Sequence, residues 1–98
     1  MAVIEWLRFA VPIELREAFI QKDEEVWTTR LHDFSGFIGK EVWLDPSTSD
    51  VVLVFHWSSF EAWHSIPKNE ILRLKTQMGD LDLPVVESRA YQVRKFLH

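Results

Sequence analysis

Two histidine and two tryptophan residues stand close together in the segment FHWSSFEAWH, and they are the first candidates for chemistry in this sequence. An imidazole titrates near neutral pH, so His56 is a candidate general base. Trp57 and Trp63 offer flat apolar surfaces that can wall a site for a planar molecule, and His64 and Trp6 are further candidate contacts. Each has an ordinary alternative: a tryptophan is more often core packing, and a histidine more often a hydrogen-bonded surface group.

Charged residues within otherwise apolar stretches near both ends of the chain form a second candidate group. Arg94 or Arg89 could hold a carboxylate or an enolate through charge-assisted hydrogen bonds. The ordinary alternative is pairing of opposite charges across neighbouring strands, which also accounts for Glu5, Arg8 and Glu87. Arg94 is the member of this group that we predict to contact a substrate.

Several classes of site and partner are not expected. The four histidines show no HxH or HxxxH spacing, so no metal site is predicted. The absence of cysteine excludes thiol chemistry and disulfides, and it fits a reducing compartment, so we expect a cytoplasmic protein. A net charge of -4 makes nucleic acid an unexpected partner. No apolar run has the length of a membrane span, and no signal peptide is evident.

Hydrophobic periodicity and turn residues divide the 98 residues into six elements of one domain, residues 1–98. We expect strands at residues 3–11, 37–44, 51–57 and 85–97, a helix at residues 12–34, and a second helical region at residues 58–78. Asp45-Pro46 marks a turn that makes the two central strands a hairpin. Ser58 and Glu61 form a capping box, Pro67 interrupts the second helical region near Ile66, and Asn69 caps its second piece.

The order strand, helix, strand, strand, helix, strand is typical of the ferredoxin-like α+β fold, a four-stranded antiparallel sheet with helices on one face. The strands carry large apolar residues on both sides, and the sequence has no third layer to cover the second face. We therefore expect two copies to pair through the open sheet face as a homodimer.

The segment from Gly36 to Trp63 resembles the dimeric α/β-barrel superfamily, specifically its antibiotic biosynthesis monooxygenase-like branch. The resemblance rests on GFIG entering the second strand, Asp45-Pro46 at the turn, VLVFHW in the third strand, and SSFEAW opening the helix. The chain is also similar to a group of small proteins of cyanobacteria, a likeness that implies no activity. The superfamily resemblance implies a dimeric barrel whose site lies between the sheet and its helices.

The branch includes cofactor-free oxygenases of phenolic or quinol-like polyketides, as well as haem-degrading enzymes. Trp57 aligns with a tryptophan common in the branch, which the oxygenases are thought to use with an Asn four residues earlier and a Tyr six residues later. Leu53 and Trp63 occupy those two positions here. The haem-degrading members carry a proximal His in the stretch that corresponds to residues 72–77, which has none. Neither haem nor another cofactor is expected.

Two functions remain open at this point. One is a cofactor-free monooxygenase-like enzyme acting on a planar apolar or phenolic molecule. It requires a concave pocket on the order of 300 Å³, with His56 as the base and Trp57 and Trp63 as walls. The alternative is a non-catalytic domain that binds a small apolar ligand or a partner and keeps the fold without the chemistry.

Overall fold

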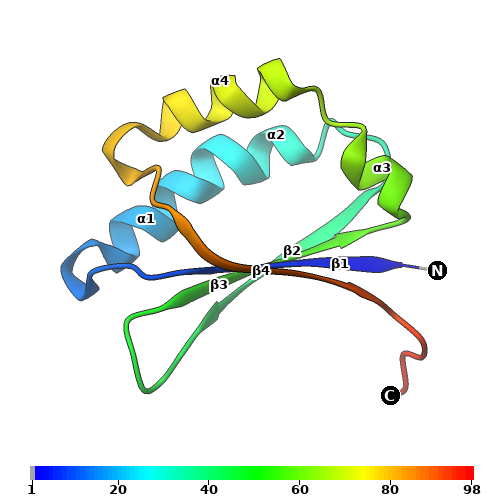
Figure 1. Cartoon of the computed structure of the whole chain (residues 1–98), viewed down its shortest axis with the longest axis horizontal. Helices are drawn as coiled ribbons and strands as arrows, with labels where there is room; N and C mark the ends of the chain where they lie inside the picture. The colour runs from blue at the N-terminus through cyan, green and yellow to red at the C-terminus, as the bar shows by residue number, and fades with distance from the viewer. Residues whose placement is uncertain (1) are drawn as a thin grey trace.

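The computed structural model describes residues 2–98 as one sheet covered on one face by helices (Figure 1). The strands are β1 (Val3–Phe9), β2 (Phe37–Leu44), β3 (Val51–Trp57) and β4 (Val85–Gln92). They lie in the order β2-β3-β1-β4, and every neighbouring pair is antiparallel. The fold is therefore ferredoxin-like, as the order of elements predicted.

The helical layer has two parts, one on each side of the β2–β3 hairpin in the sequence. The first comprises η1 (Ile13–Leu15), α1 (Arg16–Asp23), the π-helix η2 (Glu24–Thr28) and α2 (Thr29–Leu31). The second comprises α3 (Phe60–His64), α4 (Lys68–Met78) and η3 (Gly79–Leu81). Within residues 2–98, no helix combines the length and apolar character needed to cross a bilayer.

The residue that caps the second helical part differs by one position from the capping residue predicted from the sequence. Ser59, and not Ser58, is the N-cap of α3, and its Oγ accepts a hydrogen bond of 3.0 Å from the Ala62 N–H. The predicted interruption near Pro67 is confirmed, since α3 and α4 are separate helices. Asn69 does not cap α4, because Pro67 holds the N-cap position and Asn69 lies inside the first turn.

Two strands are shorter than predicted. β1 stops at Phe9, although Val11 is buried beyond its end, and β4 stops at Gln92. β4 lies at one edge of the sheet, and all of its residues except Glu87 are exposed. Its polar composition is thus explained by its position at the edge of the sheet.

Gly36 joins the first helical part to β2 and fixes where β3 and α3 meet. Its φ of +88° lies in the left-handed region, and its carbonyl accepts a hydrogen bond of 2.8 Å from the Ser58 N–H. A Cβ atom at this position would collide with the Cβ of Ala62 and lie 2.7 Å from Ser58 Oγ. The close approach holds Trp57, at the end of β3, next to the helix that carries Trp63.

Alternation along the strands separates the two faces of the sheet. On β1, Val3, Glu5, Leu7 and Phe9 face the helices, and Ile4, Trp6 and Arg8 face the other side. The core between sheet and helices contains Phe19, Leu31, Leu53, Phe55, Trp57 and Met78 among its buried residues. Both faces of the sheet therefore carry apolar groups, but only the inner one is covered by helices.

Candidate functional site

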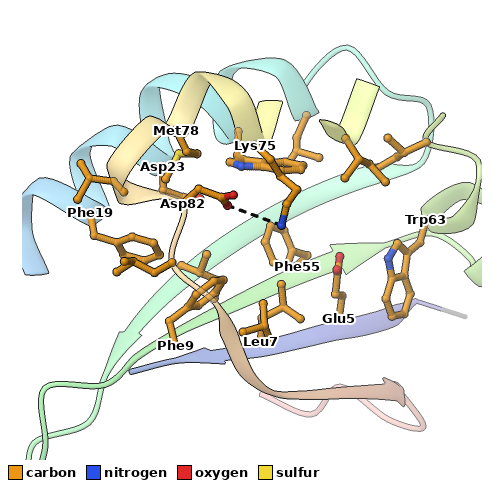
Figure 2. A pocket seen from close by; sticks show the side chains of 18 of the residues that line it. Glu5, Leu7, Phe9, Phe19, Asp23, Phe55, Trp63, Lys75, Met78 and Asp82 are labelled. Atoms are coloured by element: carbon orange, nitrogen blue, oxygen red, sulfur yellow. Dashed lines mark ion pairs between the residues drawn. The ribbon is translucent and has the colours of Figure 1, made fainter. Parts of the chain in front are cut away.

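A cavity of about 440 Å³ lies between the inner face of the sheet and the helices (Figure 2). Six aromatic side chains line it: Phe9, Phe19, Trp27, Phe55, Trp57 and Trp63. Its volume falls within the range typical of small-molecule sites, and its wall is mostly apolar. The pocket that the enzyme hypothesis requires is therefore present.

Glu5 is the carboxyl group on the sheet side of this cavity (Figure 2). Burial raises its pKa from 4.5 to about 7, because an ionised carboxylate is poorly solvated among apolar groups. A hydrogen bond of 3.3 Å from Trp57 Nε1, the positive charge of Lys40 and hydrogen bonding from Trp63 act against this rise. Glu5 can therefore gain or lose a proton near neutral pH while facing a mostly apolar cavity.

The position of Glu5 corrects the role suggested for it by the sequence. Opposite-charge pairing across strands does occur on the outer face, where Arg8 Nε lies 3.1 Å from Glu87 Oε1. Glu5 points to the inner face instead, and its hydrogen-bond partner on the neighbouring strand is the indole of Trp57. The signal available in the sequence was an acidic residue on the same side of the strand as the apolar Val3 and Leu7.

Trp57 and Trp63 both line the cavity, where the sequence predicted a substrate contact. Trp57 is fully buried, and the ring of Phe37 packs edge-on against it with centroids 5.5 Å apart. Trp63 comes from α3 and stands beside Glu5 (Figure 2). A third indole, Trp27 of the π-helix η2, lines the cavity and was not among the sequence candidates.

The two candidate histidines lie in different places. His56 points to the outer face of the sheet, where its Nε2 lies 2.7 Å from Glu41 Oε2, and it is not among the residues that line the cavity. His64 does line the cavity, and its ring packs on Trp63 with centroids 4.7 Å apart. The geometry thus separates His56 from the cavity, whereas Glu5 faces it.

Trp6 and Arg94 also lie away from the cavity. Trp6 alternates with Glu5 along β1 and faces the outer side of the sheet, opposite Val54 of β3. Arg94 follows the end of β4 and is exposed. Neither side chain lines the cavity, so contact of Trp6 or Arg94 with a ligand there is not supported by their placement.

A buried ion pair lies where α1 contributes to the wall of the cavity. Asp23 of α1 lines the cavity and pairs with Lys40 of β2, and both side chains are nearly inaccessible, at 5% and 4% exposure. Burial raises the pKa of Asp23 and lowers that of Lys40, and the attraction between them opposes both changes. Lys40 Nζ also donates a 3.0 Å hydrogen bond to Thr28 and lies 5.0 Å from the Phe55 ring centroid.

No protein-family model matches the chain, and no curated protein matches it in sequence. Solved structures do share its fold. A monooxygenase from the gene ActVA-Orf6 of Streptomyces coelicolor, in complex with nanaomycin D, has a TM-score of 0.80 at 12% identity, covering 99% of this chain and 91% of that one. SnoaB, a cofactor-independent oxygenase from Streptomyces nogalater, has a TM-score of 0.71 at 16% identity, covering 98% of this chain and 96% of that one.

A third similar structure is a dimeric ferredoxin-like protein from an uncultured marine organism. It has a TM-score of 0.72 at 19% identity, covering 99% of this chain and 92% of that one. At these identities the likeness shows the fold, which this chain shares with monooxygenases of the antibiotic biosynthesis type.

Proposed function

We propose that this chain is a small, cofactor-free monooxygenase-like enzyme that acts on a planar, mostly apolar phenol bound in the cavity. The observation that carries the proposal is the carboxyl of Glu5, whose pKa lies at about 7 inside a cavity lined by aromatic rings. A base with a pKa near the working pH is suited to removing a proton from a weak acid. The indoles of Trp57 and Trp63 would hold the ring beside it.

The reaction can be written with dioxygen as the oxidant. Glu5 accepts the phenolic proton, and the electron-rich ring carbon opposite the oxygen forms a bond to dioxygen, giving a peroxy anion. Glu5 returns the proton to make the hydroperoxide. Loss of the hydrogen on that carbon, with cleavage of the O–O bond, releases water and leaves a quinone. The ring is oxidised by four electrons, and one dioxygen is consumed for each water released.

The wall of the cavity supports Glu5 as the proton acceptor. Leu53 and Trp63 both line it, at the positions where the resemblance to the oxygenases would place an amide and a phenol. An aliphatic group and an indole cannot accept a proton from the substrate, and His56 lies on the other face of the sheet. Glu5 is the half-buried group that combines access to the cavity with a pKa near neutral pH.

The test is oxygen consumption with 1-naphthol as substrate and 1,4-naphthoquinone as the expected product. The purified chain should consume one dioxygen for each quinone formed, and Glu5→Gln should lose at least about a hundredfold in kcat while still binding 1-naphthol. Binding without turnover by the unaltered chain would reject the enzyme and favour the alternative, a non-catalytic small-molecule-binding domain. The replacement of an amide by Leu53 is the observation that favours that alternative.

We also infer that two copies pair through the outer sheet face. That side carries Trp6 and the exposed Trp43 and Tyr91, and Phe96 and Leu97 follow β4 with more than 80% exposure. A patch of this kind is unusual on a monomer. Sedimentation at micromolar concentration should give the mass of a dimer, and a stable monomer would contradict the pairing. The cytoplasmic location and the kinship with small cyanobacterial proteins stay predictions.

A further inference from the structure

Four of the residues that line the cavity are both ionisable and exposed, and we call them the cavity mouth: His64, Lys68, Lys75 and Asp82. Lys68 and Lys75 are seven residues apart on α4, so they lie on the same face of that helix. Two ammonium groups face one carboxylate there, in a chain whose net charge is -4. The mouth therefore has the opposite sign to the protein as a whole.

Lys75 and Glu5 approach the cavity from opposite walls. Lys75 extends from α4 toward the sheet, and Glu5 rises from β1 beside Trp63 (Figure 2). The aromatic rings of Phe55 and Trp63 belong to the lining of the same cavity. The cavity thus offers a proton acceptor on its sheet wall, a cation on its helix wall, and a mostly apolar lining around both.

We propose that the phenol bound in this cavity carries a carboxylate, so that the preferred ligand is a planar hydroxyaromatic carboxylate. Its hydroxyl group meets Glu5, its ring lies among the tryptophans, and its carboxylate binds Lys75 and Lys68 at the mouth. This names the substrate class of the proposed monooxygenase-like activity and rests on that function.

The ion pair at the mouth leaves Lys75 available to such an anion. Lys75 Nζ lies 3.7 Å from Asp82 Oδ1, beyond hydrogen-bond distance, and the Lys75 side chain is 50% exposed. Ion pairs of this kind contribute little to stability, so a ligand carboxylate can displace Asp82 at small cost. A hydrogen bond between an ammonium and a carboxylate is stronger than one between neutral groups.

The ordinary alternative is that the two lysines are solvated surface groups with no ligand role. That view predicts no difference between an anionic and a neutral ligand beyond the general repulsion by a chain of net charge -4. It therefore predicts weaker binding of the anion, which is the reverse of our proposal.

The proposal is tested by calorimetric titration with 5-hydroxy-1-naphthoic acid and with 1-naphthol, which lacks the carboxylate. We expect the acid to bind about tenfold more tightly than the naphthol. Lys75→Met should reduce that preference to less than about threefold while leaving the naphthol affinity within about twofold.

Asp82→Asn should strengthen binding of the acid, because it removes the competing carboxylate. Lys95→Met makes the same change of charge away from the cavity and should leave the preference intact.

Equal affinity for the two ligands, or a preference that survives in Lys75→Met, would overturn the assignment of an anionic ligand. These results are separate from the test of the proposed function. Turnover of 1-naphthol that depends on Glu5 but shows no preference for the acid would leave the enzyme proposal standing and remove this one. A Lys75-dependent preference without oxygen consumption would keep the anion site and remove the enzyme.

Discussion

The indole N–H of Trp57 donates a hydrogen bond of 3.3 Å to Oε1 of Glu5, across the pairing of β1 with β3. Glu5 faces an apolar cavity, and burial raises its pKa to about 7 although this hydrogen bond favours the ionised form. These two effects, with the charge of Lys40 and the hydrogen bonding of Trp63, set the pH at which the carboxyl changes charge. The Trp57 side chain therefore has an electrostatic role as well as a packing role.

The first prediction concerns this hydrogen bond. With 1-naphthol as substrate, kcat/KM should rise with pH through an apparent pKa near 7, because only ionised Glu5 accepts a proton. Trp57→Phe removes the donor that favours the carboxylate, so the midpoint should move to higher pH. Trp27→Phe is the matched control, since Trp27 lines the same cavity and is not among the groups that set the Glu5 pKa. A midpoint that stays in place in Trp57→Phe would contradict the role of the bond.

The second prediction concerns stability as a function of pH. A carboxyl whose pKa is higher in the folded than in the unfolded state binds protons more tightly when folded. Its stabilising contribution to the free energy of unfolding is therefore fully present at low pH. That contribution is lost as pH rises from about 4.5 to about 7. Since one pKa unit corresponds to about 1.4 kcal/mol, the change amounts to about 3 kcal/mol at most, and water in the cavity reduces it.

Urea unfolding of the unaltered chain and of Glu5→Gln at a series of pH values measures this change. Glu5→Gln should gain free energy of unfolding relative to the unaltered chain over that interval, and the difference should level off above it. Two stability curves that remain parallel from pH 4 to pH 8 would show that Glu5 does not titrate abnormally.

The elements that form the fold could be read from local signals. The strand–turn–strand pattern around Asp45-Pro46 predicted β2 and β3 with their observed bounds, because a hairpin needs only alternation and a turn. The interruption at Pro67 followed from the steric restriction that proline imposes. Trp57 and Trp63 were recognised as candidates because they lie in the segment that resembles the oxygenases and offer flat apolar surfaces.

Glu5, the cavity residue on which the proposed function rests, was harder to recognise from the sequence. β1 is apolar on both faces, so its sequence does not say which face the helices cover, and the inward position of Glu5 follows only from tertiary packing. Trp27 lies in a π-helix, whose wider turn changes the direction of its side chains relative to an α-helix. Alternation along β3 puts His56 and Trp57 on opposite faces of the strand, but which of those faces borders the cavity follows only from the fold.

The third prediction concerns the buried pair between Asp23 and Lys40. Lys40→Met leaves the Asp23 carboxylate buried without its partner, and we expect a loss of about 3–5 kcal/mol in the free energy of unfolding. The double variant Lys40→Met with Asp23→Leu removes both charges and should recover most of that loss. Urea unfolding of the two single variants and the double variant measures the coupling. Additive losses would mean that the pair is not energetically coupled.

The fourth prediction concerns Gly36. Gly36→Ala places a Cβ against Ala62 at a φ of +88°, so left-handed strain and overpacking should together lower the free energy of unfolding by about 2–4 kcal/mol. Gly39→Ala is the control, because its Cβ would meet nothing within 4 Å. Thermal unfolding of the two variants distinguishes them. Equal melting temperatures would show that the contact between Gly36 and α3 is not tight.

The last prediction separates the two candidate bases. His56 pairs with Glu41 on the outer face, so His56→Ala should leave the affinity for 1-naphthol and the rate of its oxidation within about twofold of the unaltered chain. Glu5→Gln should lower kcat by at least about a hundredfold, because an amide cannot accept the substrate proton. Steady-state oxygen consumption by both variants at saturating 1-naphthol gives the comparison. A large loss of rate in His56→Ala, with Glu5→Gln still active, would return the role of base to His56. Because His56 lies on the face through which we expect two copies to pair, sedimentation of His56→Ala must accompany the assay, so that a loss of assembly is not mistaken for a loss of the base.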